Sequence, residues 1–139
     1  MKVKEIMSRD VQVVRPDDPL RDVAQKMADY DIGSLPVCDG QKIKGMITDR
    51  DIAIRAVAQG RGPDATAASA MSAGVEYCFE DDDVEEVCAK MADRQIRRLP
   101  VLDANHNLVG IISLGDLAVE GAEDVAAEAL EQISQPGVH

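Results

Sequence analysis

Apolar residues recur every three or four positions in two stretches of the chain, and this spacing predicts two amphipathic helices. The expected apolar faces consist of Leu20, Val23, Ala24, Met27 and Ala28 in the first stretch and Val84, Val87, Cys88 and Met91 in the second. Short runs of branched and apolar residues predict strands around each helix. These runs cover residues 11–14, 35–38, 44–48, 75–79, 99–102 and 108–112.

A further helix is expected after the last strand of each set. One should cover residues 49–59 and end at Gly60 and Gly62, and the other should begin at Gly115. Asp17 or Asp18 is expected to cap the first amphipathic helix, with Pro19 in its first turn. The triplet Asp81-Asp82-Asp83 should cap the second. The predicted order β-α-β-β-α therefore occurs twice, which indicates an α/β fold.

The two halves also match residue by residue. A shift of 64 residues aligns several short segments, and one inserted residue near Asn105 changes the shift to 65. The matches are Met7-Ser8 with Met71-Ser72, Lys26 to Asp29 with Lys90 to Asp93, Leu35 to Val37 with Leu99 to Val101, and Gly45 to Asp51 with Gly110 to Asp116. The chain is therefore predicted to be a tandem duplication.

The repeat defines the expected domain organisation. Residues 1–62 should form the first repeat with an N-terminal segment, residues 63–121 a linker helix and the second repeat, and residues 122–139 a C-terminal helix and tail. A half of about 60 residues buries too little surface to be more than marginally stable alone. We therefore expect the two repeats to pack together about a pseudo-two-fold axis.

The duplicated segment from Gly45 to Asp51 reads as a buried strand that runs into a helix, with Thr48 at the junction. A hydroxyl and free N–H groups at a helix N-terminus suit phosphate, and a carboxylate three residues later suits the vicinal hydroxyls of a ribose. The alternative is that Thr48 and Ser113 cap helices and that Asp51 and Asp116 favour the helix dipole. The second copy favours a binding site.

Composition narrows the class of protein. With 15 basic and 26 acidic residues the net charge is −11, which disfavours nucleic-acid binding. The first residues lack the apolar run of a signal peptide, and no stretch is long enough to span a membrane. Cys38, Cys78 and Cys88 show no paired spacing, which favours buried reduced thiols in a cytoplasmic protein over a disulfide or a metal site. No catalytic motif is present, so we do not expect an enzyme.

The repeat and its motifs resemble a tandem pair of cystathionine-β-synthase (CBS) domains, also called a Bateman module. The resemblance covers residues from about Lys2 to about Val119. It is carried by Ile32, Leu35 to Val37 and Gly45 to Asp51 in the first copy, and by Ile96 to Val101 and Gly110 to Asp116 in the second. Three stretches are most similar to small stand-alone bacterial CBS-pair proteins, a group that includes the hypoxic-response type: Asp31 to Gly33, Gly45 to Ile52 and Gln59 to Arg61.

The resemblance implies a ligand-sensing regulatory module. Its ligand would be AMP, ADP, ATP or S-adenosylmethionine, bound in one or both clefts between the repeats, with magnesium accompanying ATP and no resident cofactor or metal. One implied site contains Gly33, Ser34, Thr48, Arg50, Asp51, Ala70 and Met71. The other contains Ile6, Met7, Arg97, Arg98, Ser113 and Asp116. The aspartates would hold the ribose, the hydroxyls and arginines the phosphates, and backbone groups the adenine edge.

The two implied sites differ in their arginines. The second copy has Arg97 and Arg98 where the first has Gly33 and Ser34, and this predicts a stronger preference for phosphate at the second site. The alternative for this pair is a solvated helix end that offsets the acidic surface. The resemblance also implies a homodimer formed through helices, which signals to an unknown downstream protein. The alternative function is a structural or protein-partner module whose clefts are empty.

Overall fold

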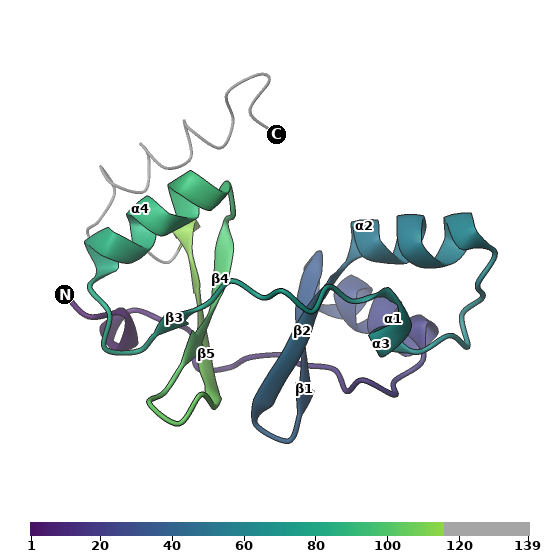
Figure 1. Cartoon of the computed structure of the whole chain (residues 1–139), viewed down its shortest axis with the longest axis horizontal. Coiled ribbons are helices and arrows are strands. Elements are labelled where there is room, and N and C mark those ends of the chain that lie inside the picture. Colours follow the sequence, from purple (N-terminus) through teal and green to yellow (C-terminus); the bar gives the residue numbers. More distant parts are fainter. Residues whose placement is uncertain (116–139) are drawn as a thin grey trace. The chain divides into compact units, whose positions relative to one another are not determined.

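The computed structural model describes residues 1–115 of the 139-residue chain (Figure 1). These residues belong to two compact units, one formed by Gln12–Val75 and the other by Met1–Val11 together with the described residues from Glu76 onward. The N-terminal segment thus lies with the second repeat, and the linker up to Val75 lies with the first. Each compact unit therefore takes in the segment that precedes the other repeat. The boundaries 1–62, 63–121 and 122–139 remain a prediction about the repeats along the sequence.

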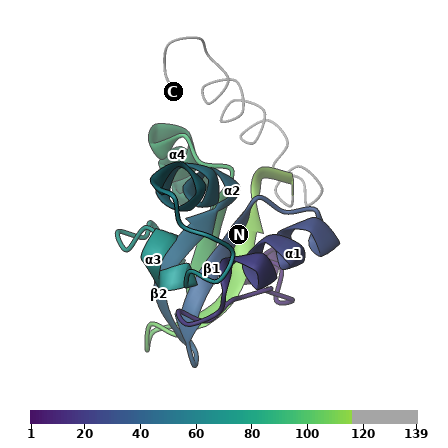
Figure 2. The same ribbon diagram turned by 90° about the vertical axis from the view of Figure 1, so that its right-hand side faces the viewer.

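The unit Gln12–Val75 consists of one antiparallel hairpin and several helices, and Figure 2 turns it toward the viewer. Its elements are α1 (Leu20–Tyr30), β1 (Ser34–Asp39), β2 (Lys42–Thr48), α2 (Asp49–Asp51) and α3 (Ala67–Ala70). The helix that begins as α2 continues as a π-helical turn over Ile52–Ala56 and a 3-10 turn over Val57–Gln59. It ends at Gly60, where φ is +79°, so the predicted helix over 49–59 is present with an irregular second half.

The core of this unit lies between α1 and the hairpin. Leu20, Val23 and Met27 are buried together with Leu35, Val37 and Ile47, all in one cluster. Leu35 is opposite Ile47 in the register of β1 and β2, which places both on the buried face of the hairpin. Ala24 and Ala28, predicted on the apolar face of α1, are exposed instead, because only the three larger side chains reach the sheet.

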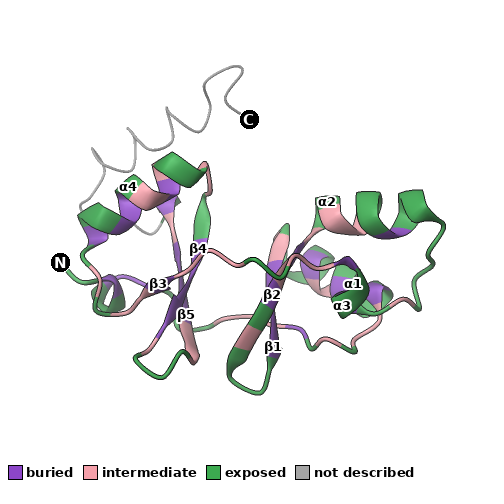
Figure 3. Cartoon of the chain, viewed as in Figure 1, coloured by how far each residue is buried: buried purple, intermediate pink, exposed green. Residues whose placement is uncertain are grey.

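The other unit contains a three-stranded sheet in the order β3-β4-β5. Its elements are the 3-10 turn η1 (Val3–Glu5), β3 (Cys78–Phe79), α4 (Val84–Arg94), β4 (Arg98–Leu102) and β5 (Leu108–Ser113). All four predicted apolar residues of α4 are buried, on the side that faces the strands in Figure 3. The helix expected from Gly115 onward and the C-terminal helix lie outside the described residues.

The strand that opens each repeat is shorter than predicted, and in each repeat a lysine hydrogen bond accounts for part of the missing strand pairing. In place of a strand over 11–14 there is one bridge between Val14 and Val37, and β3 has only two residues. The Lys26 ammonium donates to the carbonyl of Val13 at 2.7 Å, and Lys90 donates to the carbonyl of Tyr77. These carbonyls therefore bond a side chain of the amphipathic helix, so they need no neighbouring strand.

The helix caps differ in part from those predicted. Pro19 is the N-cap of α1 and its side chain cannot cap the helix, while the Asp18 carboxylate accepts from the backbone N–H of Arg15 at 2.9 Å instead. Of the triplet before α4, Asp83 caps the helix by accepting from the N–H of Glu85. Asp81 instead forms an ion pair with Lys4 at 3.0 Å, which lowers the pKa of Asp81 and raises that of Lys4. This pair links the N-terminal segment to its unit.

Candidate ligand sites in the two units

In each unit a methionine-serine segment lies directly against the glycine that opens the duplicated motif. The Ser72 N–H donates to the carbonyl of Met46 and the Met46 N–H to the carbonyl of Ser72, both at 2.9 Å. A Cβ at Gly45 would lie 2.6 Å from the Ser72 oxygen and 2.7 Å from the Met71 sulfur. A glycine is therefore required here for the linker to approach β2.

The other unit repeats this arrangement with the N-terminal segment. Ser8 and Ile111 exchange backbone hydrogen bonds of 2.8 and 2.9 Å. A Cβ at Gly110 would lie 2.6 Å from the Met7 sulfur and 2.9 Å from the Ser8 oxygen. The two glycines thus have the same role, and each brings the segment before the opposite repeat to the edge of the motif.

The structure consequently groups the predicted site residues as the sequence grouped them. Gly33, Ser34, Thr48, Arg50, Asp51, Ala70 and Met71 all lie in the unit Gln12–Val75. Ile6, Met7, Arg97, Arg98 and Ser113 lie in the other unit, and Asp116 lies outside the described residues. Ile6, Met7 and Ala70 have buried side chains in the two cores, so a ligand would meet the backbone of these segments.

The end of β2 forms a complete capping box. The Thr48 hydroxyl accepts from the backbone N–H of Asp51, and the Asp51 carboxylate accepts in return from the N–H of Thr48, both at 3.0 Å. The capping interpretation of this pair is therefore confirmed. The Asp51 carboxylate can still accept further hydrogen bonds, because each of its oxygens has two lone pairs and the side chain is 16% exposed.

Gly33 and Ser34 border the same end of the hairpin. The Asp49 N–H donates to the carbonyl of Gly33 at 3.0 Å, and Ser34 is opposite Thr48 in the strand register. A Cβ at Gly33 would lie 3.1 Å from an oxygen of Asp49, so the glycine keeps this junction narrow. The residues that the sequence assigned to the first site thus lie around one strand-to-helix junction.

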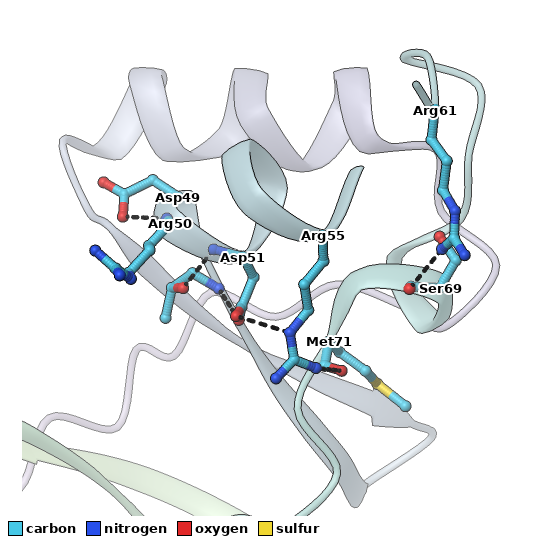
Figure 4. Close-up of polar contacts among 8 residues, drawn as sticks. Asp49, Arg50, Asp51, Arg55, Arg61, Ser69 and Met71 are labelled. Atoms are coloured by element: carbon cyan, nitrogen blue, oxygen red, sulfur yellow. Dashed lines mark hydrogen bonds and ion pairs between the residues drawn. The ribbon is translucent and has the colours of Figure 1, made fainter. Parts of the chain in front are cut away.

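Arg50 and Arg55 lie at this junction, whereas Arg61 follows the end of the helix, away from Asp51 in Figure 4, and only Arg50 was among the predicted site residues. Arg50 is exposed, and within residues 1–115 its guanidinium has no hydrogen bond or ion pair. Arg55 has its Nε 3.7 Å from Asp51 Oδ1 and donates from Nη1 to the carbonyl of Met71 at 3.2 Å (Figure 4). Arg61 donates to the carbonyl of Ser69 at 2.9 Å. The spacing of four residues from Asp51 was the signal that could have identified Arg55.

The junction in the other unit has the same backbone but different side chains. The Leu114 N–H donates to the carbonyl of Arg97 at 3.1 Å, and Arg98 is opposite Ser113 in the register of β4 and β5. Arg97 and Arg98 therefore occupy the places of Gly33 and Ser34, as the alignment predicted. Both arginines are exposed.

Charge is distributed unequally between the units. Gln12–Val75 contains eight Lys or Arg and nine Asp, a net charge of −1, whereas the described residues 1–11 and 76–115 contain seven basic and eleven acidic residues, a net charge of −4. An anionic ligand therefore meets less long-range repulsion in the first unit. The predicted phosphate preference of the second site rests on Arg97 and Arg98 alone, and the charge of their unit opposes it.

Burial favours the protonated form of all three cysteine thiols, so they are weak nucleophiles at neutral pH. The three cysteines are free and buried, and burial raises the pKa of Cys38 to about 11 and that of Cys78 to about 12. Within residues 1–115 no three His, Cys, Asp or Glu side chains gather where they could hold a metal ion. Over the same residues no helix has the length and apolar character required to cross a membrane.

Comparison with known proteins identifies the family. The CBS domain model matches twice, over residues 3–57 and 67–123. The CBS domain-containing protein YhcV of Bacillus subtilis is 40% identical over 138 residues, which are 99% of this chain and 98% of that protein. Hypoxic response protein 1 of Mycobacterium tuberculosis is 35% identical over 135 residues, which are 96% of this chain and 94% of that protein.

A solved structure extends the comparison to a ligand-bound relative. The CBS domain pair of protein MJ0100, crystallised with 5′-methylthioadenosine and S-adenosyl-L-methionine, is 28% identical with a TM-score of 0.74. The match covers 89% of this chain and 98% of that one. The duplicated motif, the repeated strand-to-helix junction and these matches lead to one conclusion: the chain belongs to the CBS-domain proteins and carries two CBS domains in tandem.

Proposed function

We propose that this protein is a regulatory module that binds an adenosine-containing compound, AMP, ADP, ATP or S-adenosylmethionine, and signals through the geometry of a homodimer. The observation that carries the proposal is the junction around Thr48 and Asp51, where a partly exposed carboxylate with spare acceptors lies beside the linker backbone. Further support comes from the CBS pair of MJ0100, whose two bound compounds both contain adenosine.

Each residue of the first site has a role under this proposal. Asp51 accepts hydrogen bonds from the two ribose hydroxyls, while Thr48 and Arg50 bind the phosphates and Gly33 and Ser34 border the ligand. The backbone at Ala70 and Met71 contacts the adenine edge. In the second unit Ser113, Arg97, Arg98 and Asp116 have the corresponding roles, with the backbone at Ile6 and Met7. A cytoplasmic location, where thiols stay reduced, fits the buried free cysteines and forms part of the proposal.

Thermal unfolding in the presence of adenosine compounds tests this function. A ligand at about one hundred times its Kd stabilises the folded state by about 2.7 kcal/mol, which raises the Tm of a chain of this size by about 9 °C. AMP, ADP, ATP and S-adenosylmethionine are compared with and without magnesium, with inosine monophosphate as the control for the base. If none of them shifts the Tm at millimolar concentration, the ligand-sensing function is wrong.

The homodimer is proposed to form through the helix over residues 49–59. Ile54 and Val57 lie three residues apart on this helix and are 44% and 67% exposed, so two apolar side chains share a solvent-facing side. A charge at Val57 should therefore dissociate the dimer, and Val57→Glu is expected to run as a monomer in size-exclusion chromatography with light scattering. Gln41→Glu, in the exposed turn between β1 and β2, adds the same charge and should stay dimeric. A dimeric Val57→Glu protein would contradict this interface.

A further inference from the structure

Arg55 is a cation next to the carboxylate that the proposed function assigns to the ribose. Its Nε lies 3.7 Å from Asp51 Oδ1, while Oδ2 of the same carboxylate accepts from the N–H of Thr48. The other end of the guanidinium donates to the carbonyl of Met71 at 3.2 Å. Figure 4 shows Arg55 reaching from its helix to both partners. The side chain is thus held beside Asp51 by a second, independent contact.

Arg55 matters for an anionic ligand because it offsets the negative charge of Asp51. A ribose bound to Asp51 brings its 5′-phosphate to within about 7 Å of the carboxylate, where the two negative charges repel each other. The Arg55 guanidinium compensates the charge of Asp51 at short range. It is also 52% exposed, so it can turn toward a bound anion without being pulled out of a core.

Two other features make Arg55 particular to the first site. It lies in the π-helical turn Ile52–Ala56, in which the Val57 N–H donates to the carbonyls of both Ile52 and Ala53, and such turns frequently occur at functional sites. In the second repeat the equivalent sequence position is Glu120, which has the opposite charge. In the sequence, the aspartate of the motif is shared by the repeats, whereas the arginine four residues after it is not.

We propose that Arg55 neutralises and positions Asp51, and thereby makes the first site prefer phosphorylated adenosine compounds over uncharged ones. This inference rests on the proposed function. Without Arg55 the ribose carboxylate would repel the phosphate of the ligand it holds, and uncharged adenosine would lose much less affinity than AMP. The preference for AMP is therefore a property of the Asp51–Arg55 pair.

The test compares the affinities for AMP and adenosine by isothermal titration calorimetry of the whole chain at low ionic strength. Arg55→Gln should lower the ratio of AMP to adenosine affinity by about threefold or more, since a unit charge at about 7 Å changes affinity by this factor even in water. Arg55→Lys keeps the charge and should preserve most of the ratio. Arg61→Gln is the matched control, because Arg61 also donates to a backbone carbonyl near α3 and its guanidinium has no ion pair within the described residues.

A double variant separates charge compensation from a purely structural role. Adding Asp51→Asn to Arg55→Gln removes the uncompensated negative charge, so the AMP to adenosine ratio should return toward its original value although both affinities fall. If Arg55→Gln changes the ratio no more than Arg61→Gln, or if the double variant restores nothing, the inference is wrong while the proposed function stands. If the unmodified chain binds neither compound, this inference is wrong, and the thermal-unfolding comparison with ADP, ATP and S-adenosylmethionine decides the proposed function separately.

Discussion

Asp51→Asn is expected to weaken adenosine-compound binding at the first site by about a hundredfold, because hydrogen bonds to a charged acceptor contribute about 1.5–3 kcal/mol and a ribose offers two of them. Asparagine keeps one oxygen that can accept from the Thr48 N–H, so the capping box and the fold should persist. The measurement is isothermal titration calorimetry with AMP, together with the Tm of the ligand-free protein to verify folding.

The neighbouring aspartate provides the control for Asp51. Asp49→Asn removes the same charge two residues away, at an exposed side chain whose one hydrogen bond within residues 1–115 is from the N–H of Arg50. It should bind AMP within about threefold of the unmodified chain, because its effect is limited to screened surface electrostatics. Equal losses in the two variants would show that general charge, and not a ribose contact, determines binding.

Gly45→Ala and Gly110→Ala are each expected to lower the free energy of unfolding by about 1–3 kcal/mol, the usual cost of an overpacked site. The added Cβ would lie 2.6 Å from the Ser72 oxygen in one case and 2.9 Å from the Ser8 oxygen in the other. Backbone atoms give way less easily than a flexible methionine, so the Met-Ser segments must shift. Chemical denaturation followed by circular dichroism measures the loss.

Gly74→Ala is the matched control for these two variants. A Cβ there would meet no atom within 4 Å, and its φ lies outside the left-handed range, so alanine should be neutral or slightly stabilising. The clash in Gly45→Ala should also weaken ligand binding, because the segment that packs against Gly45 contains Ala70 and Met71 of the proposed site. A Gly45→Ala protein as stable as Gly74→Ala would contradict the required close approach.

The elements with the strongest periodicity were predictable from the sequence. The face of α4 is buried at all four predicted positions, because three- and four-residue spacing places those side chains on one side of any helix. In α1 the same rule identified Leu20, Val23 and Met27 but also included Ala24 and Ala28, which are exposed. Periodicity indicates which side of a helix is apolar, but packing against the sheet determines how many residues on that side are buried.

The candidate site was predictable in part. The duplicated motif identified Thr48 and Asp51, and the structure shows them bonded to each other at the end of β2. The four-residue spacing from Asp51 was a signal for Arg55, but its contact with the carbonyl of Met71, sixteen residues away, and its π-helical turn could not be read from the sequence. The reduced opening strands were missed for a similar reason, since Lys26 and Lys90 bond carbonyls thirteen residues before them.

The sequence by itself determined that the chain is a duplication, where the amphipathic helix and the two antiparallel strands of each copy lie, and which residue types recur at the strand-to-helix junctions. These are local properties, set by periodicity and by residues adjacent along the chain. Only the tertiary structure decided that the segment before each repeat lies in the unit of the other, with Met71-Ser72 against Gly45 and Met7-Ser8 against Gly110. The physical reason is that such pairing depends on hydrogen bonds and steric fit between residues far apart in the chain, where a glycine admits the second backbone.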